Sequence, residues 1–172
     1  MTNQEVEPSP SVDQQAEAMV RAAFAHARAG EAGALNALLK RGVPADVRNA
    51  KGDSLLMLAS YHGHLAAVWV LLAQGADPEL RNDRGQSPLA GAAFKGDVPV
   101  ARALLDQGAA VDGAGPDGKT PLMFAAMFDR VELCALLIER GARIGARESS
   151  GKTAWDLARA MGAEKAAALL DR

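Results

Sequence analysis

Few residues in this chain combine the types and the spacing that chemistry requires. Residues 113–118 read Gly-Ala-Gly-Pro-Asp-Gly, which matches the glycine spacing of a dinucleotide-binding loop. Such a loop cradles a pyrophosphate only where it follows a buried strand and opens a helix. Here the glycines fall in a predicted turn between two helices, and Pro116 stiffens that turn. We therefore expect no nucleotide cofactor at this run.

The histidines and the single cysteine are the other candidates for chemistry. His62 and His64 flank Gly63, and His26 lies far upstream. A metal site needs three or four converging ligands, so we expect a structural polar contact from His64. Cys134 lies in an apolar helical run with no base near it in the sequence, which favours a buried, inert thiol. We predict that the protein is not an enzyme and that it binds no metal or cofactor.

The elements that would position these residues repeat along the chain. Loop glycines recur every 33 residues at positions 52, 85, 118 and 151, and helix-end glycines recur at 42, 75, 108 and 141. One copy begins Gly-Lys-Thr-Pro-Leu-Met-Phe-Ala-Ala at 118–126 and ends Leu-Ile-Glu-Arg-Gly-Ala at 137–142. A regular period of this length indicates a repeat architecture.

Each copy carries the start and stop signals of two short helices. A serine or threonine is placed to cap the first helix, at positions 54, 87 and 120. That helix should end at a glycine in two copies and at Asp129 in the third, because Asp tolerates the left-handed conformation. Upstream, Ser11 and Gln14 predict a capping box for an N-terminal helix.

These signals predict an all-α solenoid of helix-turn-helix units joined by short β-turn-like loops. Residues 1–11 are polar and are expected to form a disordered tail. Residues 12–172 form the repeat domain, with units at about 12–48, 49–81, 82–114, 115–147 and 148–172. The first and last units are N- and C-terminal capping repeats, as a solenoid needs at its ends.

The repeat resembles the ankyrin repeat over about residues 18–172. The resemblance rests on the Gly-x-Thr-Pro-Leu-x-x-Ala-Ala start and the Leu-Leu-x-x-Gly-Ala end at the period of 33. It implies a module that binds a protein partner in a groove along the first helices of the repeats. The family's usual His after Pro-Leu is replaced here by Met57, Ala90, Met123 or Asp156, so we expect its inter-repeat hydrogen bonds to be missing.

The resemblance further implies that partner contacts come from the loop tips and from the last two residues of each inner helix. The chain has only seven aromatic residues, and three of them fall at those helix ends. Interface cores are enriched in aromatic residues and Met. The predicted partner-binding residues are Tyr61, Phe94 and Met127 in one stripe, His62, Lys95 and Phe128 in a parallel stripe, and Asp53, Asp83, Arg84, Asp117 and Lys119 at a polar rim.

Two packing alternatives stay open at this point. The aromatic rings could lean into the neighbouring repeat as part of the core, and Phe124 could fill the space that Gly91 leaves at the same position of the previous inner helix. Trp69 on an outer helix could mark a convex contact or a dimer seam, or it could lie flat over neighbouring side chains.

Two functions follow. The first is capture of one protein partner, as an inhibitor, an immunity factor or an accessory chaperone. The alternative is a self-associating structural protein, in which Trp69 or the aromatic residues build a homodimer.

Composition sets the class of partner and the compartment. A net charge of −2 argues against a nucleic-acid footprint. A single cysteine fits a reducing compartment. No apolar run approaches the roughly 18–20 residues of a membrane span, and the N-terminal residues lack the apolar segment of a signal peptide. We expect a cytoplasmic monomer without nucleic-acid or membrane partners.

Overall fold

The computed structural model describes residues 11–171, so the predicted disordered tail lies outside the described residues except for Ser11. Within that range no strand occurs, and Arg48 and Ser54 form an isolated antiparallel bridge. The prediction of an all-α repeat solenoid is confirmed. The helices are α1 (Val12–Ala29), α2 (Ala32–Lys40), α3 (Leu55–Tyr61), α4 (Leu65–Ala73), α5 (Pro88–Lys95), α6 (Val98–Asp106), α7 (Pro121–Met127), α8 (Val131–Glu139), α9 (Ala154–Met161) and α10 (Glu164–Leu170).

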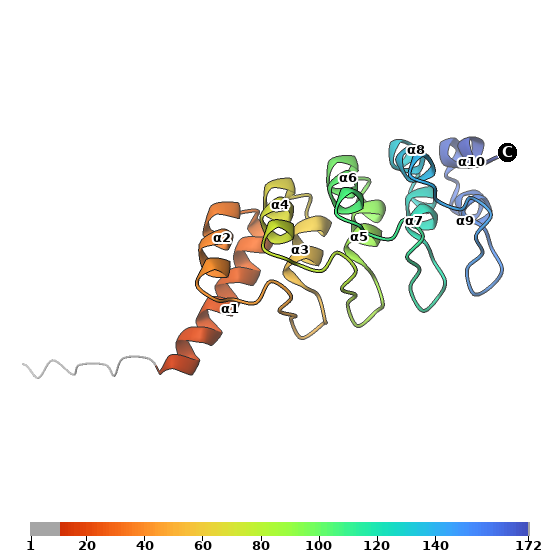
Figure 1. The fold of residues 1–172 in the computed structure, drawn as a ribbon. Helices are drawn as coiled ribbons and strands as arrows, with labels where there is room; N and C mark the ends of the chain where they lie inside the picture. The colour runs from red at the N-terminus through yellow and green to blue at the C-terminus, as the bar shows by residue number, and fades with distance from the viewer. Residues whose placement is uncertain (1–10, 172) are drawn as a thin grey trace, which may run out of the picture.

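The helices stack in two layers (Figure 1). The inner layer runs α1, α3, α5, α7, α9 and the outer layer runs α2, α4, α6, α8, α10, each helix packing on the next in its layer and on its hairpin partner. The loops that join one repeat to the next project from one side of the stack. We call them the first to fourth fingers: residues 43–54, 76–87, 109–120 and 142–153.

The caps that the sequence predicts are present. The Ser11 hydroxyl accepts the Gln14 N–H while the Gln14 side chain accepts the Ser11 N–H, so the capping box is closed. Asp129 adopts a φ of 55° and is the one described non-glycine residue with positive φ. Its carboxylate accepts the Ala166 N–H at 2.7 Å, in the first turn of α10. The left-handed Asp129 therefore both ends α7 and tethers the next repeat.

The core consists mainly of Leu and Ala from both layers. Leu55, Leu89 and Leu122 stand at equivalent places in three inner helices and are fully buried. Cys134 of α8 is also fully buried, which confirms its predicted place in the core. Burial raises the pKa of its thiol to about 12, and the carboxylate of Asp129 adds to that rise. A thiol with this pKa stays protonated near neutral pH and is a poor nucleophile.

The fingers are closed by side chains that accept backbone N–H groups two and four residues further on. Asn49, Asn82 and Glu148 do this at equivalent positions of the first, second and fourth fingers. The third finger has Gly115 at that position and lacks this bond. Glu148 also accepts the Ser150 hydroxyl, and this bond together with the two N–H bonds lowers its pKa to about 2.

The lowered pKa of Glu148 predicts an acid dependence of folding. The folded carboxylate keeps its charge to a lower pH than the unfolded one, so its stabilisation is complete above pH 4.5 and is lost as the pH falls toward about 2. We expect wild type and Glu148→Gln to converge in free energy of unfolding across this window, as measured by chemical denaturation. A difference that stays constant through the window would contradict the role of the charge.

The burial of Cys134 predicts its reactivity. In the native chain a thiol reagent such as dithionitrobenzoate should label Cys134 only at the rate of unfolding. The matched control is Cys134→Ala/Ala135→Cys, which moves the thiol to an adjacent exposed position of α8 and should react at once. Rapid labelling of native wild type would contradict the buried, protonated thiol.

Candidate functional site

Three aromatic rings from successive inner helices form a continuous row, which we call the aromatic ladder. The Tyr61 and Phe94 rings stack with centroids 6.1 Å apart, and the Phe94 and Phe128 rings meet edge to face at 4.4 Å. Both separations fall in the range of favourable aromatic pairs. The residues lie 33 or 34 positions apart, so the stacking of the repeats brings them together.

The two predicted stripes are merged rather than parallel. α5 extends to Lys95, whereas α3 ends at Tyr61 and α7 ends at Met127. Phe128 therefore lies just outside its helix and contacts Phe94. Met127 packs partly buried against the core instead of continuing the row. The Lys95 ammonium lies 4.8 Å from the centre of the Tyr61 ring, in a cation–π contact.

His62 lies beside the ladder. Its exposed ring meets Tyr61 edge to face at 5.4 Å and stacks on His64 at 6.1 Å. Partial desolvation lowers the pKa of His62, and the cationic forms of His64, Lys95 and Arg28 nearby lower it further. His62 is therefore a neutral polar group at neutral pH.

The rings of the aromatic ladder pack against one another and are also partly exposed at the surface. Tyr61 is 39% exposed, and Phe94 and Phe128 are half-buried without joining the apolar core. The open alternative, that the rings lean into neighbouring repeats, is thus correct for the contacts they make with one another. Part of each residue stays accessible along the inner layer.

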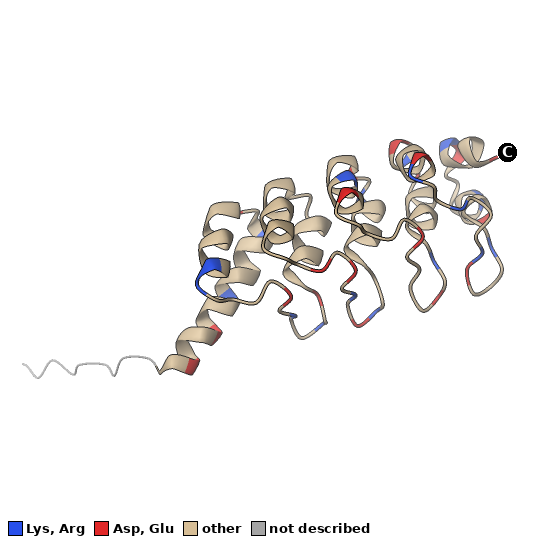
Figure 2. Cartoon of the chain, viewed as in Figure 1, with Lys and Arg blue, Asp and Glu red and all other residues tan. Residues whose placement is uncertain are grey.

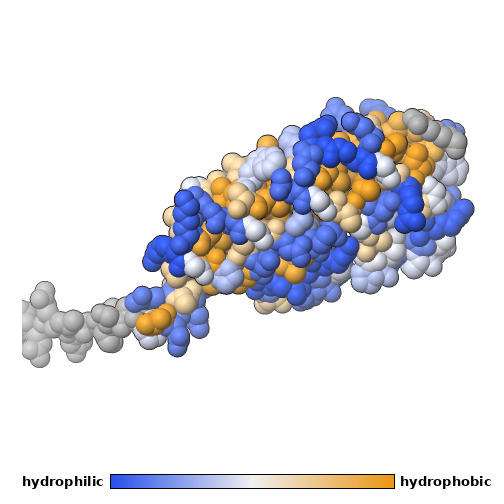
Figure 3. Space-filling model, viewed as in Figure 1, coloured by the Kyte–Doolittle hydropathy of each residue, from blue (hydrophilic) through white to orange (hydrophobic). Residues whose placement is uncertain are grey.

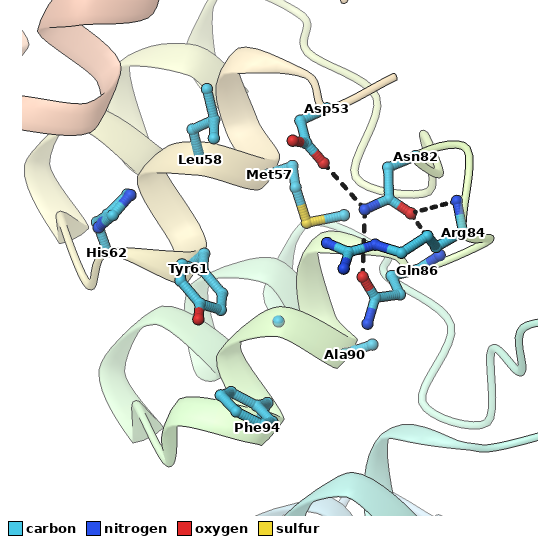
Figure 4. Close-up of a pocket in the computed structure, with 11 residues that line it drawn as sticks. Asp53, Met57, Leu58, Tyr61, His62, Asn82, Arg84, Gln86, Ala90 and Phe94 are labelled. Atoms are coloured by element: carbon cyan, nitrogen blue, oxygen red, sulfur yellow. Dashed lines mark hydrogen bonds between the residues drawn. The ribbon is translucent and has the colours of Figure 1, made fainter. Parts of the chain in front are cut away.

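A pocket of about 360 Å³ opens between α3, α5 and the second finger (Figure 4). Met57, Tyr61 and Phe94 form its apolar wall. Gly91 also lines the pocket. The expectation that Phe124 fills the space at Gly91 is wrong. A Cβ placed on Gly91 would have the Met57 Sδ at 3.6 Å as its nearest neighbour, and Phe124 lines a separate cavity of about 200 Å³ at the third finger.

The expectation that Asp53 stands at an exposed rim is also wrong. Asp53 is only 9% exposed, and its carboxylate accepts the Asn82 amide at 2.9 Å. Asn82 in turn bonds the Gln86 side chain at 3.2 Å (Figure 4). The Asp53 carboxylate and the Asn82 amide are both withdrawn from water, so each needs a hydrogen-bond partner within the protein. The bond between them joins the first finger to the second.

The remaining rim residues differ in how they are paired. Asp83 accepts a guanidinium hydrogen bond from Arg48 at 3.1 Å, and Asp117 pairs with the Lys119 ammonium at 2.8 Å. The side-chain hydrogen bond from Lys119 lowers the pKa of Asp117. Arg84 is exposed and makes no ion pair within residues 11–171; its guanidinium points toward Met57 across the pocket (Figure 4). Figure 2 shows that the charged residues gather on the fingers and on the outer helices.

The other candidates for chemistry have structural places. His64 Nε2 lies 2.7 Å from the Arg28 carbonyl oxygen, which confirms the expected structural contact. The glycine run at 113–118 turns between α6 and α7, where the Gly118 N–H donates to the Gly115 carbonyl at 2.9 Å. No strand precedes that run in the described chain. Among residues 11–171, no three His, Cys, Asp or Glu side chains converge on a metal-sized space.

Six residues of the pocket lining were not among the predicted partner-binding residues: Met57, Leu58, Asn82, Gln86, Ala90 and Gly91. The signal for Gly91 was present. Leu58 of α3, Phe124 of α7 and Leu157 of α9 occupy the same position, so within these repeats a glycine removes a large side chain from α5 only.

Trp69 stands apart from this surface, on outer helix α4. It is 44% exposed and does not join the core cluster.

Figure 3 shows apolar residues exposed between hydrophilic ones along the row of helices. None of the described helices is both long and apolar enough to span a bilayer.

Comparison with known proteins agrees with this architecture. A family model described as ankyrin repeats (3 copies) matches residues 19–114 and 56–148. A protein of Pseudomonas aeruginosa that is named as an ankyrin repeat protein is 52% identical over 61 residues, a match that spans 36% of each chain. The family model covers well over half of the 172 residues. The chain therefore belongs to the ankyrin repeat family, whose members generally mediate protein–protein interactions.

Proposed function

We propose that this protein captures one protein partner along its inner layer, with the aromatic ladder and the adjoining pocket as the contact surface. The predicted residues Tyr61, His62, Phe94, Lys95 and Phe128 form the centre of that surface. Met127 and Asp53 support it from behind. The polar rim consists of Asp83, Arg84, Asp117 and Lys119.

The aromatic ladder is the observation that carries this proposal. Three of the seven aromatic residues of the chain meet in one row, in which Tyr61 is exposed and Phe94 and Phe128 are half-buried. Packing of an alanine-rich inner layer does not require rings there, and a large apolar group left at the surface costs solubility. Covering about 100 Å² of such surface contributes roughly 2–3 kcal/mol before association costs are subtracted.

The proposal includes no catalysis. Asp53, the one carboxylate in the pocket lining, bonds Asn82, and His64, on which His62 stacks, lies at hydrogen-bond distance from the Arg28 carbonyl. Binding would itself be the activity, as it is for an inhibitor, an immunity factor or an accessory chaperone. A cytoplasmic location is part of the proposal, because the single cysteine makes no disulfide within the chain.

The test is capture of a partner from the soluble lysate of the source organism by wild type and by two groove variants. Phe94→Asp places a charge in the ladder, and Lys95→Glu reverses an exposed charge at little structural cost. Each should lower partner affinity at least about tenfold, since truncated interface anchors lose about 2 kcal/mol or more.

Trp69→Asp is the matched control for this experiment, because it makes the same change of an aromatic residue on the outer layer. It should retain the partner. Circular dichroism must show equal helix content for all variants. A partner held equally by wild type and both groove variants would contradict the groove as the contact surface.

A second candidate function is self-association through Trp69, favoured by the 44% exposure of this large ring. It predicts a mass that rises with concentration in sedimentation equilibrium and returns to the monomer value in Trp69→Asp. A monomer mass for wild type at about 100 times the usual working concentration would exclude it.

A further inference from the structure

We infer that the pocket at Gly91 is a subsite for one large apolar side chain of an acidic partner segment, and that Arg84 and Lys95 receive the carboxylates on either side of that side chain. This inference rests on the proposed function and adds the chemistry of the partner.

The shape of the pocket comes from one missing side chain. Gly91 occupies a position where α3, α7 and α9 carry Leu or Phe, and the vacated space is walled by Met57, Tyr61 and Phe94. Its volume of about 360 Å³ lies at the low end of ligand-sized pockets. A half-open space of this size, with an apolar wall and an exposed aromatic ring beside it, can receive a single interface anchor.

The charges around the pocket determine which residues can flank the apolar side chain in the partner segment. Arg84 of the second finger and Lys95 at the end of α5 are both exposed, and neither makes an ion pair within the described chain. Two other cations of the neighbouring fingers are already paired, Arg48 with Asp83 and Lys119 with Asp117. The rim therefore offers two cations that have no carboxylate partner in the described chain, and the Lys95 ammonium also contacts the Tyr61 ring.

The one carboxylate in the lining carries a single negative charge against their two positive charges. Asp53 is buried, and its two oxygens accept amide hydrogen bonds from Asn82 at 2.9 Å and from Asn49 at 3.4 Å. His62, which also lines the pocket, is neutral near pH 7 because desolvation and nearby cations lower its pKa. The field at the mouth is thus positive, which selects acidic segments and raises their association rate.

The arrangement is held rigidly. The Asn82 side chain accepts the backbone N–H groups of Arg84 and Gln86 at 3.1 and 3.0 Å while it donates to Asp53. The backbone that carries Arg84 is therefore fixed relative to α3. A preformed site of this kind binds with a smaller entropic cost than a loop that must order.

The test is selection of a library of random peptides, each about twelve residues long, on the purified full chain, followed by affinity measurement of the enriched peptides by fluorescence anisotropy. The enriched peptides should carry a Trp, Phe, Leu or Met with Asp or Glu within two or three positions. Gly91→Leu should lower their affinity at least about tenfold by filling the pocket. Arg84→Gln should weaken them and flatten the dependence of affinity on salt.

Matched controls separate the pocket from general damage. Gly91→Ala adds a Cβ at an ordinary 3.6 Å contact with Met57 Sδ and should keep affinity within about threefold. Arg102→Gln removes an exposed cation from outer helix α6 and should leave affinity and its salt dependence unchanged. Both glycine replacements raise helix propensity at a position without positive φ.

Each contrary outcome is distinct from failure of the proposed function. Peptides that bind wild type and Gly91→Leu equally, or that are basic or lack an apolar residue, would overturn the subsite. If those same peptides were lost on Lys95→Glu, the groove would still be the binding surface. Failure to enrich any peptide on wild type over Gly91→Leu would also overturn the subsite, whatever the lysate experiment shows.

Discussion

Every repeat of this chain leaves an apolar face that only the next repeat can cover. The buried Leu55, Leu89 and Leu122 of successive inner helices show how that requirement is met at a fixed step. Because each repeat contacts only its neighbours, residues 33 positions apart must come side by side. The aromatic ladder is a consequence of this spacing. Tyr61 and Phe94 occupy equivalent positions near the ends of α3 and α5, so the regular stacking of the repeats brings their rings together.

The candidate site arises where one repeat departs from this regular packing. Gly91 removes a side chain that its equivalents supply, and the neighbouring helices do not close the gap. The second finger is then fixed over the gap through Asn82, which links Asp53 to the backbone around Arg84. The interactions that stabilise the stack thus also shape a preformed surface with cations at its mouth.

The sequence predicted features that depend on local rules. A serine, a glycine or Asp129 at a fixed offset ends or begins a helix whatever surrounds it, and these predictions were confirmed. Predictions that depend on a second repeat were weaker. The burial of Asp53 follows from an amide 29 residues away, and Met127 packs against the core where its equivalents Tyr61 and Phe94 join the ladder. The only sign of the pocket in the sequence was Gly91, at a repeat position where Leu58, Phe124 and Leu157 are large.

The central claim is that the partner binds the inner layer at the ladder and the second finger. Hydrogen–deuterium exchange of the chain alone and in complex with its captured partner tests this directly, because it reports where backbone becomes protected. The account predicts added protection at residues 55–63 and 84–96, with little change in outer helix α4 at 65–73. Protection confined to α4 and its outer-layer neighbours, with 55–63 and 84–96 unchanged, would contradict it.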